Sequence, residues 1–154
     1  MEKINVRKAT QDEIKLVNNL CNEVKTYYAL WDKDYPVIDN FIESFEGDGL
    51  FVITLDGKII GSLSTEESPF SNEFISLTRF FILKDYQRKG YGSKLFSEVE
   101  KELSKKYEYT ELLVNSLHPF GFKMYEKFGY SNLGKVDINF GTSNIYYRFI
   151  KKIR

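Results

Sequence analysis

The segment with the clearest chemical potential is a basic turn that contains two glycines and begins a helix. Arg88 and Lys89 precede Gly90 and Gly92, and an apolar run over residues 80–83 leads into the turn. The first turn of a helix carries unpaired backbone N–H groups and the positive end of the helix dipole. Glycines remove the side chains that would keep an anion away from those groups, and the two cations add full charge. This combination predicts a site that holds a pyrophosphate.

A solvated loop is the alternative interpretation of the same turn, because two glycines alone are a weak signal. The turn is not a P-loop, since Gly90 is not followed at the required spacing by Gly-Lys-Ser or Gly-Lys-Thr. It also lacks the three glycines of a dinucleotide-binding fingerprint. The residues that follow are therefore needed to choose between the two interpretations.

Two motifs, in order and at the expected spacing, resemble the GNAT superfamily of acetyl-CoA-dependent N-acetyltransferases. The first is Gln87-x-x-Gly90-x-Gly92 after a strand, which is similar to the acyl-CoA pyrophosphate motif of that family. The second, over residues 118–130, includes Tyr-Glu-Lys-Phe-Gly-Tyr and is similar to the family's Tyr-Glu-Lys-x-Gly-Phe. The resemblance extends to the order of elements along the chain, and it implies a single GNAT N-acetyltransferase domain over residues 1–154.

The resemblance also implies how acetyl-CoA, the co-substrate, would be held. The backbone of Phe81 and Ile82 would pair with the pantetheine amides where the long strand splays from its neighbour, and the glycine turn would wrap the pyrophosphate. His118 stands where the family often has Asn, and it would cap the helix or contact the cofactor rather than act as a base. The expected cofactor-binding residues are Phe81, Ile82, Gln87, Arg88, Lys89, Gly90, Tyr91, Gly92, Ser93 and His118.

Tyr125, within the second motif, would protonate the departing CoA thiolate. A tyrosine hydroxyl with a pKa of about 10 is protonated at pH 7 and can hydrogen-bond to a thiolate whose pKa is about 8.5. An aromatic side chain packed in the core is the alternative role for Tyr125. The expected reaction is direct: the amine attacks the thioester in a ternary complex, without an acyl-enzyme.

A general base is expected as well, because an alkyl amine with a pKa of about 10 arrives mostly protonated. Some family members place a catalytic glutamate on the long strand, and Ser76 occupies that position here. Glu73 on the same strand is the predicted catalytic residue, with Glu66, Glu67 or a water chain as alternatives. Cys21 lies on the apolar face of a predicted helix, so we expect a buried thiol and not a nucleophile.

The acceptor is expected to be a primary amine on a small molecule or a peptide. An aromatic and acidic stretch over residues 27–35 could hold a cationic amine, or it could be a partly buried helix end with solvated charges. A small amine, an amino-sugar antibiotic and a peptide α-amine all stay open. The alternative function is a non-catalytic acyl-CoA sensor or interaction module that retains the cofactor site.

These residues are expected to be positioned by helices and strands that follow one another in the order β-α-α-β-β-β-α-β-α-β-β. This order predicts an α/β (α+β) domain. Its GNAT-like sheet would be mixed, mostly antiparallel, with six to seven strands and about four flanking helices. A capping box at Thr10 and Glu13 opens the first helix, and Asp56-Gly57 joins a hairpin. Strands are expected at residues 4–6, 50–55, 58–63, 73–83, 109–115, 130–140 and 144–152, and helices at 14–28, 37–45, 90–106 and 119–129.

Composition limits the remaining classes of function. The 154 residues suit one domain, and 22 Lys+Arg balance 22 Asp+Glu to a net charge of zero. That balance argues against a surface devoted to nucleic acid, so a duplex-binding module, suggested only by the basic turn and the tail at 151–154, is the least favoured class. One cysteine excludes an internal disulfide and provides no metal-ligand spacing, so we expect no metal.

The chain also lacks the apolar segments that direct a protein to a membrane. Its start has no apolar core like that of a signal peptide, and no apolar run approaches the roughly 20 residues that cross a bilayer. We therefore expect a cytoplasmic protein without a membrane or nucleic-acid partner. Because dimers are common among proteins of this resemblance, a homodimer is one assembly state to test.

Overall fold

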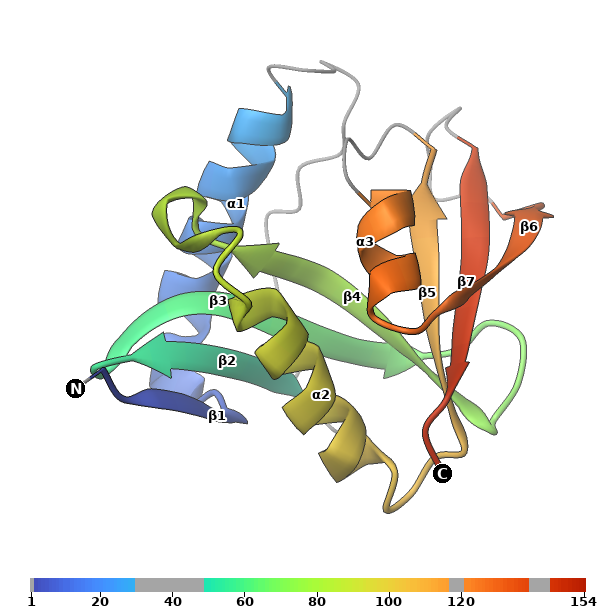
Figure 1. Ribbon diagram of the computed structural model, residues 1–154, viewed down its shortest axis with the longest axis horizontal. Coiled ribbons are helices and arrows are strands. Elements are labelled where there is room, and N and C mark those ends of the chain that lie inside the picture. The colour runs from blue at the N-terminus through green and yellow to red at the C-terminus, as the bar shows by residue number, and fades with distance from the viewer. Residues whose placement is uncertain (1, 30–48, 117–120, 139–144) are drawn as a thin grey trace.

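The computed structural model describes residues 2–29, 49–116, 121–138 and 145–154, and in these ranges the strands form a seven-stranded sheet in the order β1-β2-β3-β4-β5-β7-β6 (Figure 1). Neighbouring strands run antiparallel except for β4 and β5, which are parallel. The strands are β1 (Ile4–Lys8), β2 (Leu50–Leu55), β3 (Lys58–Glu67), β4 (Phe74–Ile82), β5 (Tyr109–Asn115), β6 (Ser131–Val136) and β7 (Tyr146–Lys152). The α-helices of the described residues are α1 (Ile14–Ala29), α2 (Tyr91–Leu103) and α3 (Gly121–Lys127).

The predicted fold class and element order are confirmed in these ranges, with small differences at the ends of elements. Three α-helices are described where about four were expected, because the predicted helix at 37–45 lies outside the described residues. Helix α2 ends at Leu103, before the predicted 106, and a turn follows it. Strand β3 continues to Glu67, beyond the predicted 63, because it goes on pairing with β4.

The helices cover the sheet from both sides (Figure 1). On one face, Val17, Cys21 and Val24 of α1 pack on a buried cluster that includes Phe81 of β4. On the other face, α2 and α3 pack on the larger cluster that includes Ile82. The sulfur-bearing side chain of Cys21 is fully buried, which confirms the expectation of an inaccessible thiol.

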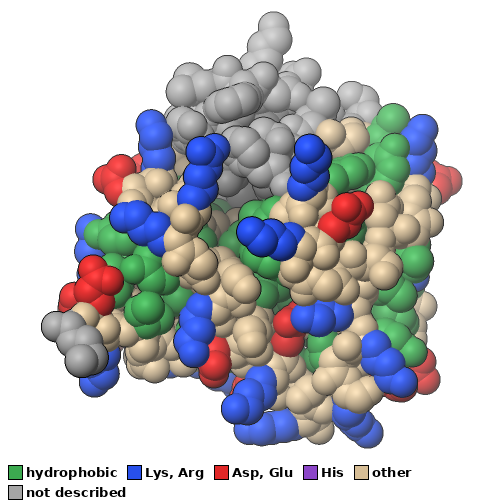
Figure 2. Space-filling view, in the orientation of Figure 1, with side chains coloured by type: hydrophobic (Ala, Val, Ile, Leu, Met, Phe, Trp, Pro, Cys, Tyr) green, Lys and Arg blue, Asp and Glu red, His purple; other side chains and the backbone are tan. Residues whose placement is uncertain are grey.

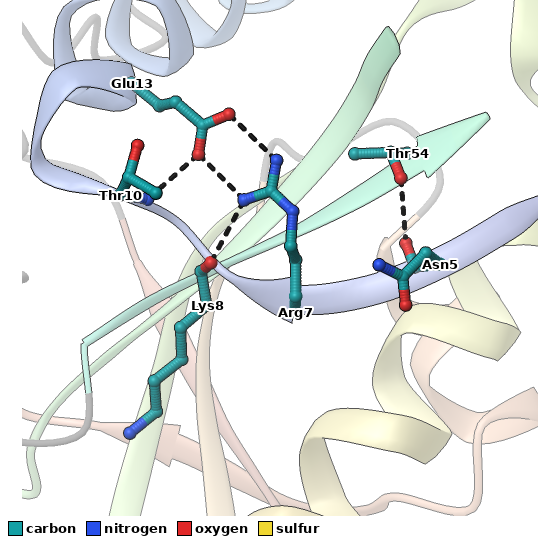
Figure 3. Close-up of polar contacts among 6 residues, drawn as sticks. All are labelled: Asn5, Arg7, Lys8, Thr10, Glu13 and Thr54. Carbon is teal, nitrogen blue, oxygen red and sulfur yellow. Dashed lines mark hydrogen bonds and ion pairs between the residues drawn. The ribbon is translucent and has the colours of Figure 1, made fainter. Parts of the chain in front are cut away.

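An ion pair joins β1 to the 3-10 turn over Gln11–Glu13 that leads into α1 (Figure 3). The Arg7 guanidinium donates to both carboxylate oxygens of Glu13, at 2.8 and 2.9 Å. The same carboxylate accepts the backbone N–H of Thr10 at 2.9 Å, the Glu-to-backbone contact of the predicted capping box. These hydrogen bonds, led by the one from Arg7, lower the pKa of Glu13 to about 2.

Strand β4 contains a bulge near its middle. Ser62 of β3 opposes Phe81 while Ser64 opposes Thr78, so β4 has one residue more than β3 in this interval. Arg79 has a φ of 50°, a left-handed conformation that is uncommon for a residue with a side chain. The Ser64 hydroxyl donates to the carbonyl oxygen of Thr78 at 3.1 Å, which holds the irregular backbone against β3.

Strands β4 and β5 pair over a short distance and then separate. Their register covers three positions, ending where Ser76 lies opposite Glu111. Beyond this point β4 continues to Ile82 without pairing to β5, and Figure 1 shows the two strands diverging toward their carboxyl ends. The expected splay of the long strand from its neighbour is therefore present. No helix in the described part of the chain is long and apolar enough to cross a membrane.

Candidate active site

A pocket of about 540 Å³ lies at the carboxyl end of β4, between the glycine turn and α3; we call it the donor pocket. Apolar side chains from β4 and α3 line part of it, and the glycine turn lines the rest. The lining residues are Phe80, Ile82, Tyr86, Gln87, Arg88, Gly90, Gly92, Ser93, Lys123, Met124, Lys127 and Phe128.

The glycine turn is shaped by its backbone and tied to the strand before it. Gly90 is the N-cap of α2 with a φ of +86°, and a Cβ added there would meet no atom within 4 Å. A Cβ at Gly92 would lie 3.0 Å from the Phe80 ring, so glycine allows close packing there. The Gln87 side chain donates to the carbonyl oxygen of Ile82 at 2.8 Å, which fixes the turn to the end of β4.

The charge around the donor pocket is positive. Arg88 from the turn and Lys123 and Lys127 from α3 line it, and no Asp or Glu is among the lining residues that the structure describes. Figure 2 shows Lys and Arg side chains on both sides of the hollow, with hydrophobic side chains within it. Together with the N-terminus of the 13-residue α2, this arrangement suits a ligand with several negative charges and an apolar segment.

Most of the predicted cofactor-binding residues meet at this pocket. The Phe81 side chain is buried in the cluster under α1 and points away from the pocket. Only the backbone of Phe81 is available to a ligand in the pocket. Lys89 and Tyr91 belong to the same turn but do not line the pocket. His118 lies outside the described residues, as do residues 30–35 of the aromatic and acidic stretch. The predicted residues that line the pocket are Ile82, Gln87, Arg88, Gly90, Gly92 and Ser93.

Tyr125 lies on α3 beside the pocket and is 6% exposed. Its ring packs edge-on against those of Phe80 and Phe128, with centroids 6.4 and 6.3 Å away, and both of these residues line the pocket. The ring also packs against Phe96 at 5.9 Å. Tyr125 therefore has the core contacts of its alternative role and is one layer behind the pocket wall; its acid role stays a prediction.

The structure does not bring Glu73 to the donor pocket. Glu73 is exposed and precedes β4, whereas the pocket lies at the other end of the strand. Phe81 is eight positions further along the chain than Glu73, which corresponds to about 26 Å of extended strand. Glu67 is exposed as well, at the end of β3 opposite Ile75. This placement puts Glu73 outside the donor pocket, and its role as the base stays a prediction.

Two other glutamates flank Ser76, one on each neighbouring strand. Glu66 of β3 and Glu111 of β5 are both in register with Ser76. The Glu66 carboxylate pairs with Arg79 at 2.9 Å, and Glu111 accepts a hydrogen bond from Arg148 of β7 at 2.6 Å. These five residues form what we call the Ser76 cluster.

Glu111 is a residue that the sequence predictions missed. Its side chain is fully buried, and the Arg148 guanidinium beside it lies over the rings of Phe70 and Phe74 at 4.5 and 4.7 Å. The sequence contained one signal for it, a carboxylate within the apolar run of a strand. A strand with a neighbouring strand on each side is buried, and charged residues are rare there unless they are paired.

A second buried network holds α3 in place. The Tyr130 hydroxyl donates to Glu100 of α2 at 2.7 Å, and Lys151 of β7 donates to the same carboxylate at 2.9 Å. Lys151 also donates to the carbonyl oxygen of Phe128, just after α3, at 3.0 Å. Burial, reinforced by the Glu100 carboxylate, raises the pKa of the Tyr130 hydroxyl, which stays protonated. The network therefore fixes the two helices that border the donor pocket.

Comparison with known families identifies the class of protein. A family model described as "Acetyltransferase (GNAT) domain" matches residues 16–149, so the chain belongs to the GNAT acetyltransferase family. Within the described residues, no three His, Cys, Asp or Glu side chains are grouped so that they could hold a metal ion.

Relatives and solved structures agree with this family. The chain is 32% identical over 72 residues to the spermine/spermidine N(1)-acetyltransferase of Bacillus subtilis (strain 168), a match that covers 44% of the chain and 46% of the relative. The chain thus spans about half the length of the curated relatives that it matches.

Two comparisons with solved structures show the fold. The yncA protein of Salmonella typhimurium, solved with its cofactor acetyl-CoA, has a TM-score of 0.76 and 15% identity, covering 99% of this chain and 95% of that one. An N-acetyltransferase from Staphylococcus aureus Mu50 has a TM-score of 0.74 and 16% identity, covering 99% of both chains. At these identities the likeness is one of fold.

Proposed function

We propose that this GNAT acetyltransferase transfers an acetyl group from acetyl-CoA to a primary amine by direct attack in a ternary complex. The observation that carries this proposal is the donor pocket, where the helix N-terminus, an open glycine cap and three cations surround an apolar interior. Acetyl-CoA combines phosphate charges with a long, largely uncharged pantetheine arm. The pocket offers complementary surface to both parts.

The donor would be held by the turn and by β4. The α2 N-terminus and the open space at Gly90 favour the pyrophosphate, with Arg88, Lys123 and Lys127 supplying charge. The apolar lining favours the pantetheine arm, which would run along the unpaired edge of β4 beyond Ser76. Backbone groups of Phe81 and Ile82 would pair with its amides, with the remaining predicted contacts made by Lys89, Tyr91, Ser93 and His118.

The leaving group would be protonated by Tyr125. As the C–N bond forms and the C–S bond breaks, the departing thiolate needs a proton, and a tyrosine hydroxyl is a suitable donor at neutral pH. Tyr125 packs directly against two aromatic rings that line the pocket, and this proximity supports the role.

The acceptor that we propose first is a polyamine. The match to a spermine/spermidine acetyltransferase supports this choice. Exposed carboxylates near the start of β4, including Glu66 and Glu67, would attract a molecule with several ammonium groups. The cytoplasm, where polyamines occur, is the proposed location, and a homodimer is the assembly state to compare with the monomer.

The test is an assay of CoA release over a panel of amines, followed by mass analysis of the product. The panel contains spermidine, an aminoglycoside and a peptide with a free α-amine. We expect thiol release with spermidine and a product that is heavier by one acetyl group. Calorimetric binding of acetyl-CoA without thiol release for any amine would contradict catalysis and favour the acyl-CoA sensor.

A further inference from the structure

One carboxylate oxygen of Glu111 has no hydrogen-bond partner in the described structure. Its side chain is fully buried, and only Oε2 has a partner, Arg148 Nε at 2.6 Å. Oε1 accepts no hydrogen bond from any residue that the structure describes. A buried charged oxygen without a partner costs free energy, so such an atom needs an explanation.

The position of Glu111 in the sheet explains why this oxygen is left without a partner. Glu111 lies opposite Ser76, the last position at which β4 and β5 are paired. The two strands separate from this point toward the donor pocket, so Glu111 is at the closed end of the wedge between them. From Ser76 to Ile82 the strand covers about 20 Å, a length comparable with an extended pantetheine arm and its acyl group.

Glu111 also faces the side of the sheet opposite the donor pocket. The alternate residues Leu112 and Val114 pack in the cluster under α2 and α3, so Glu111 projects to the α1 side. An amine held on that side would meet the acyl group without crossing the cofactor. Such an arrangement suits direct transfer between two substrates held on opposite faces.

Glu66, on the other side of Ser76, is less suited to receive an amine. Its Oε1 already pairs with Arg79 at 2.9 Å and accepts from the Thr78 hydroxyl at 3.4 Å. Its side chain is 43% exposed, so water competes for it. Glu111 differs in both respects, because its open oxygen is buried and its other oxygen is fixed by Arg148.

We infer that Glu111 is the general base of this enzyme, with Oε1 binding the acceptor amine at the closed end of the β4–β5 wedge. This inference rests on the proposed function. The ammonium gives one proton to Oε1, and the neutral nitrogen attacks the thioester carbonyl carbon. The C–N bond forms, the C–S bond breaks, and the thiolate takes a proton from Tyr125. The nitrogen then loses a second proton, which restores the Tyr125 hydroxyl and leaves a neutral amide. Glu111 releases its proton to water.

The experiment compares two acceptors that differ in basicity and hardly in size. One is an alkyl amine that the wild-type protein acetylates, and the other is its β,β,β-trifluorinated analogue, whose lowered pKa leaves it largely unprotonated at neutral pH. In Glu111→Gln, which keeps an acceptor for Arg148, we expect kcat/KM for the alkyl amine to fall by on the order of 100-fold. The loss should shrink to less than about tenfold for the fluorinated amine, because that amine needs no base.

Glu66→Gln is the matched control, since it removes the carboxylate on the other side of Ser76. Its effect should be confined to a rise of at most about tenfold in the KM of the protonated alkyl amine, with kcat unchanged for both amines. Glu111→Asp, which keeps the charge but retracts the oxygen, provides the same comparison if Glu111→Gln does not fold. Acetyl-CoA affinity, measured by calorimetry, should stay close to that of the wild type in all three variants.

An equal loss for both amines, or no loss in either Glu111 variant, would overturn the inference and leave Glu111 as a structural partner of Arg148. That result would not affect the proposed function, because the wild-type protein would still acetylate the amine. If the wild-type protein acetylates no amine, the proposed function fails and this inference fails with it.

Discussion

The donor pocket and the Ser76 cluster occupy different ends of β4 and are built in opposite ways. The pocket takes its charge from backbone N–H groups and from cations on one turn and one helix, Arg88, Lys123 and Lys127. The cluster combines two carboxylates from β3 and β5 with arginines from β4 and β7. The donor pocket is therefore positive, whereas the two carboxylates and two arginines of the Ser76 cluster balance and leave Glu111 Oε1 without a hydrogen-bond partner in the described structure. The difference also predicts which substrate each substitution will affect.

The largest effect is expected on the donor side, from Gly90→Glu. The new carboxylate would enter the space that favours pyrophosphate, and we expect the Kd of acetyl-CoA to rise by at least about 100-fold. Gly134→Glu is the matched control, because Gly134 also has a positive φ and open space but lies in β6, away from the pocket. Both variants carry a similar backbone strain of about 1–2 kcal/mol. Calorimetry should show normal affinity for the control, and normal affinity for Gly90→Glu would refute the pyrophosphate site.

Tyr125→Phe tests the chemistry between the two regions. We expect kcat to fall by about 10- to 100-fold while the Kd of acetyl-CoA changes by less than about threefold. Tyr130→Phe is the contrasting variant, because the Tyr130 hydroxyl is in the buried network with Glu100. It should cost about 1–3 kcal/mol in the free energy of unfolding with little change in kcat. If kcat in Tyr125→Phe equals that of the wild type when chemistry limits the rate, Tyr125 has only its packing role.

A substitution remote from both regions measures the fold alone. Glu13 contributes stability above its unfolded pKa of about 4.5, and this contribution is lost as pH falls toward its folded pKa of about 2. Allowing for solvent screening of the pair with Arg7, we expect Glu13→Gln to cost about 1–2 kcal/mol at pH 7 and nearly nothing at pH 2.

Urea unfolding at the two pH values measures this difference, with Glu23→Gln on the exposed side of α1 as control. A cost that is equal at both pH values would show that the ion pair contributes no pH-dependent stability. Neither variant should change the affinity for acetyl-CoA.

The smallest effects are expected from removing one or two charges in the donor pocket and in the Ser76 cluster, and they show which substrate each region binds. Lys123→Gln combined with Lys127→Gln should weaken acetyl-CoA binding by about three- to tenfold at low salt, and less at high salt, since both lysines are exposed. Glu66→Gln should instead raise the KM of a cationic acceptor by a similar factor and leave the Kd of acetyl-CoA unchanged. If the lysine variant altered only the acceptor KM, the assignment of the two regions would be reversed.

The parts of the site that were predictable from the sequence are those that form from one continuous segment. Gln87, Gly90 and Gly92 could be identified because strand, turn and helix follow each other without interruption. Glu111 could not, since its significance depends on register with Ser76, which is set by strand pairing and not by spacing along the chain. Glu73 was chosen by its nearness in sequence to the expected position, but the direction of β4 carries it away from the pocket.

The β4 bulge was equally invisible, because Arg79 adopts its positive φ without the glycine that usually indicates one. Helix α3 (Gly121–Lys127), predicted at 119–129, and the capping box at Thr10 and Glu13 were predictable, since each depends on signals close to it in the sequence. Local signals thus located the elements, while the positions of side chains across the sheet required the tertiary structure.

The extra residue at Arg79 changes the parity of β4. Before it, odd-numbered Leu77 points to the α2 side; after it, even-numbered Phe80 and Ile82 do, and odd-numbered Phe81 turns to α1. Removing one residue here would therefore exchange the wall of the donor pocket with the core beneath α1, although no amino acid in either had been replaced. The number of residues between Ser76 and the glycine turn is as much a part of this site as their identity.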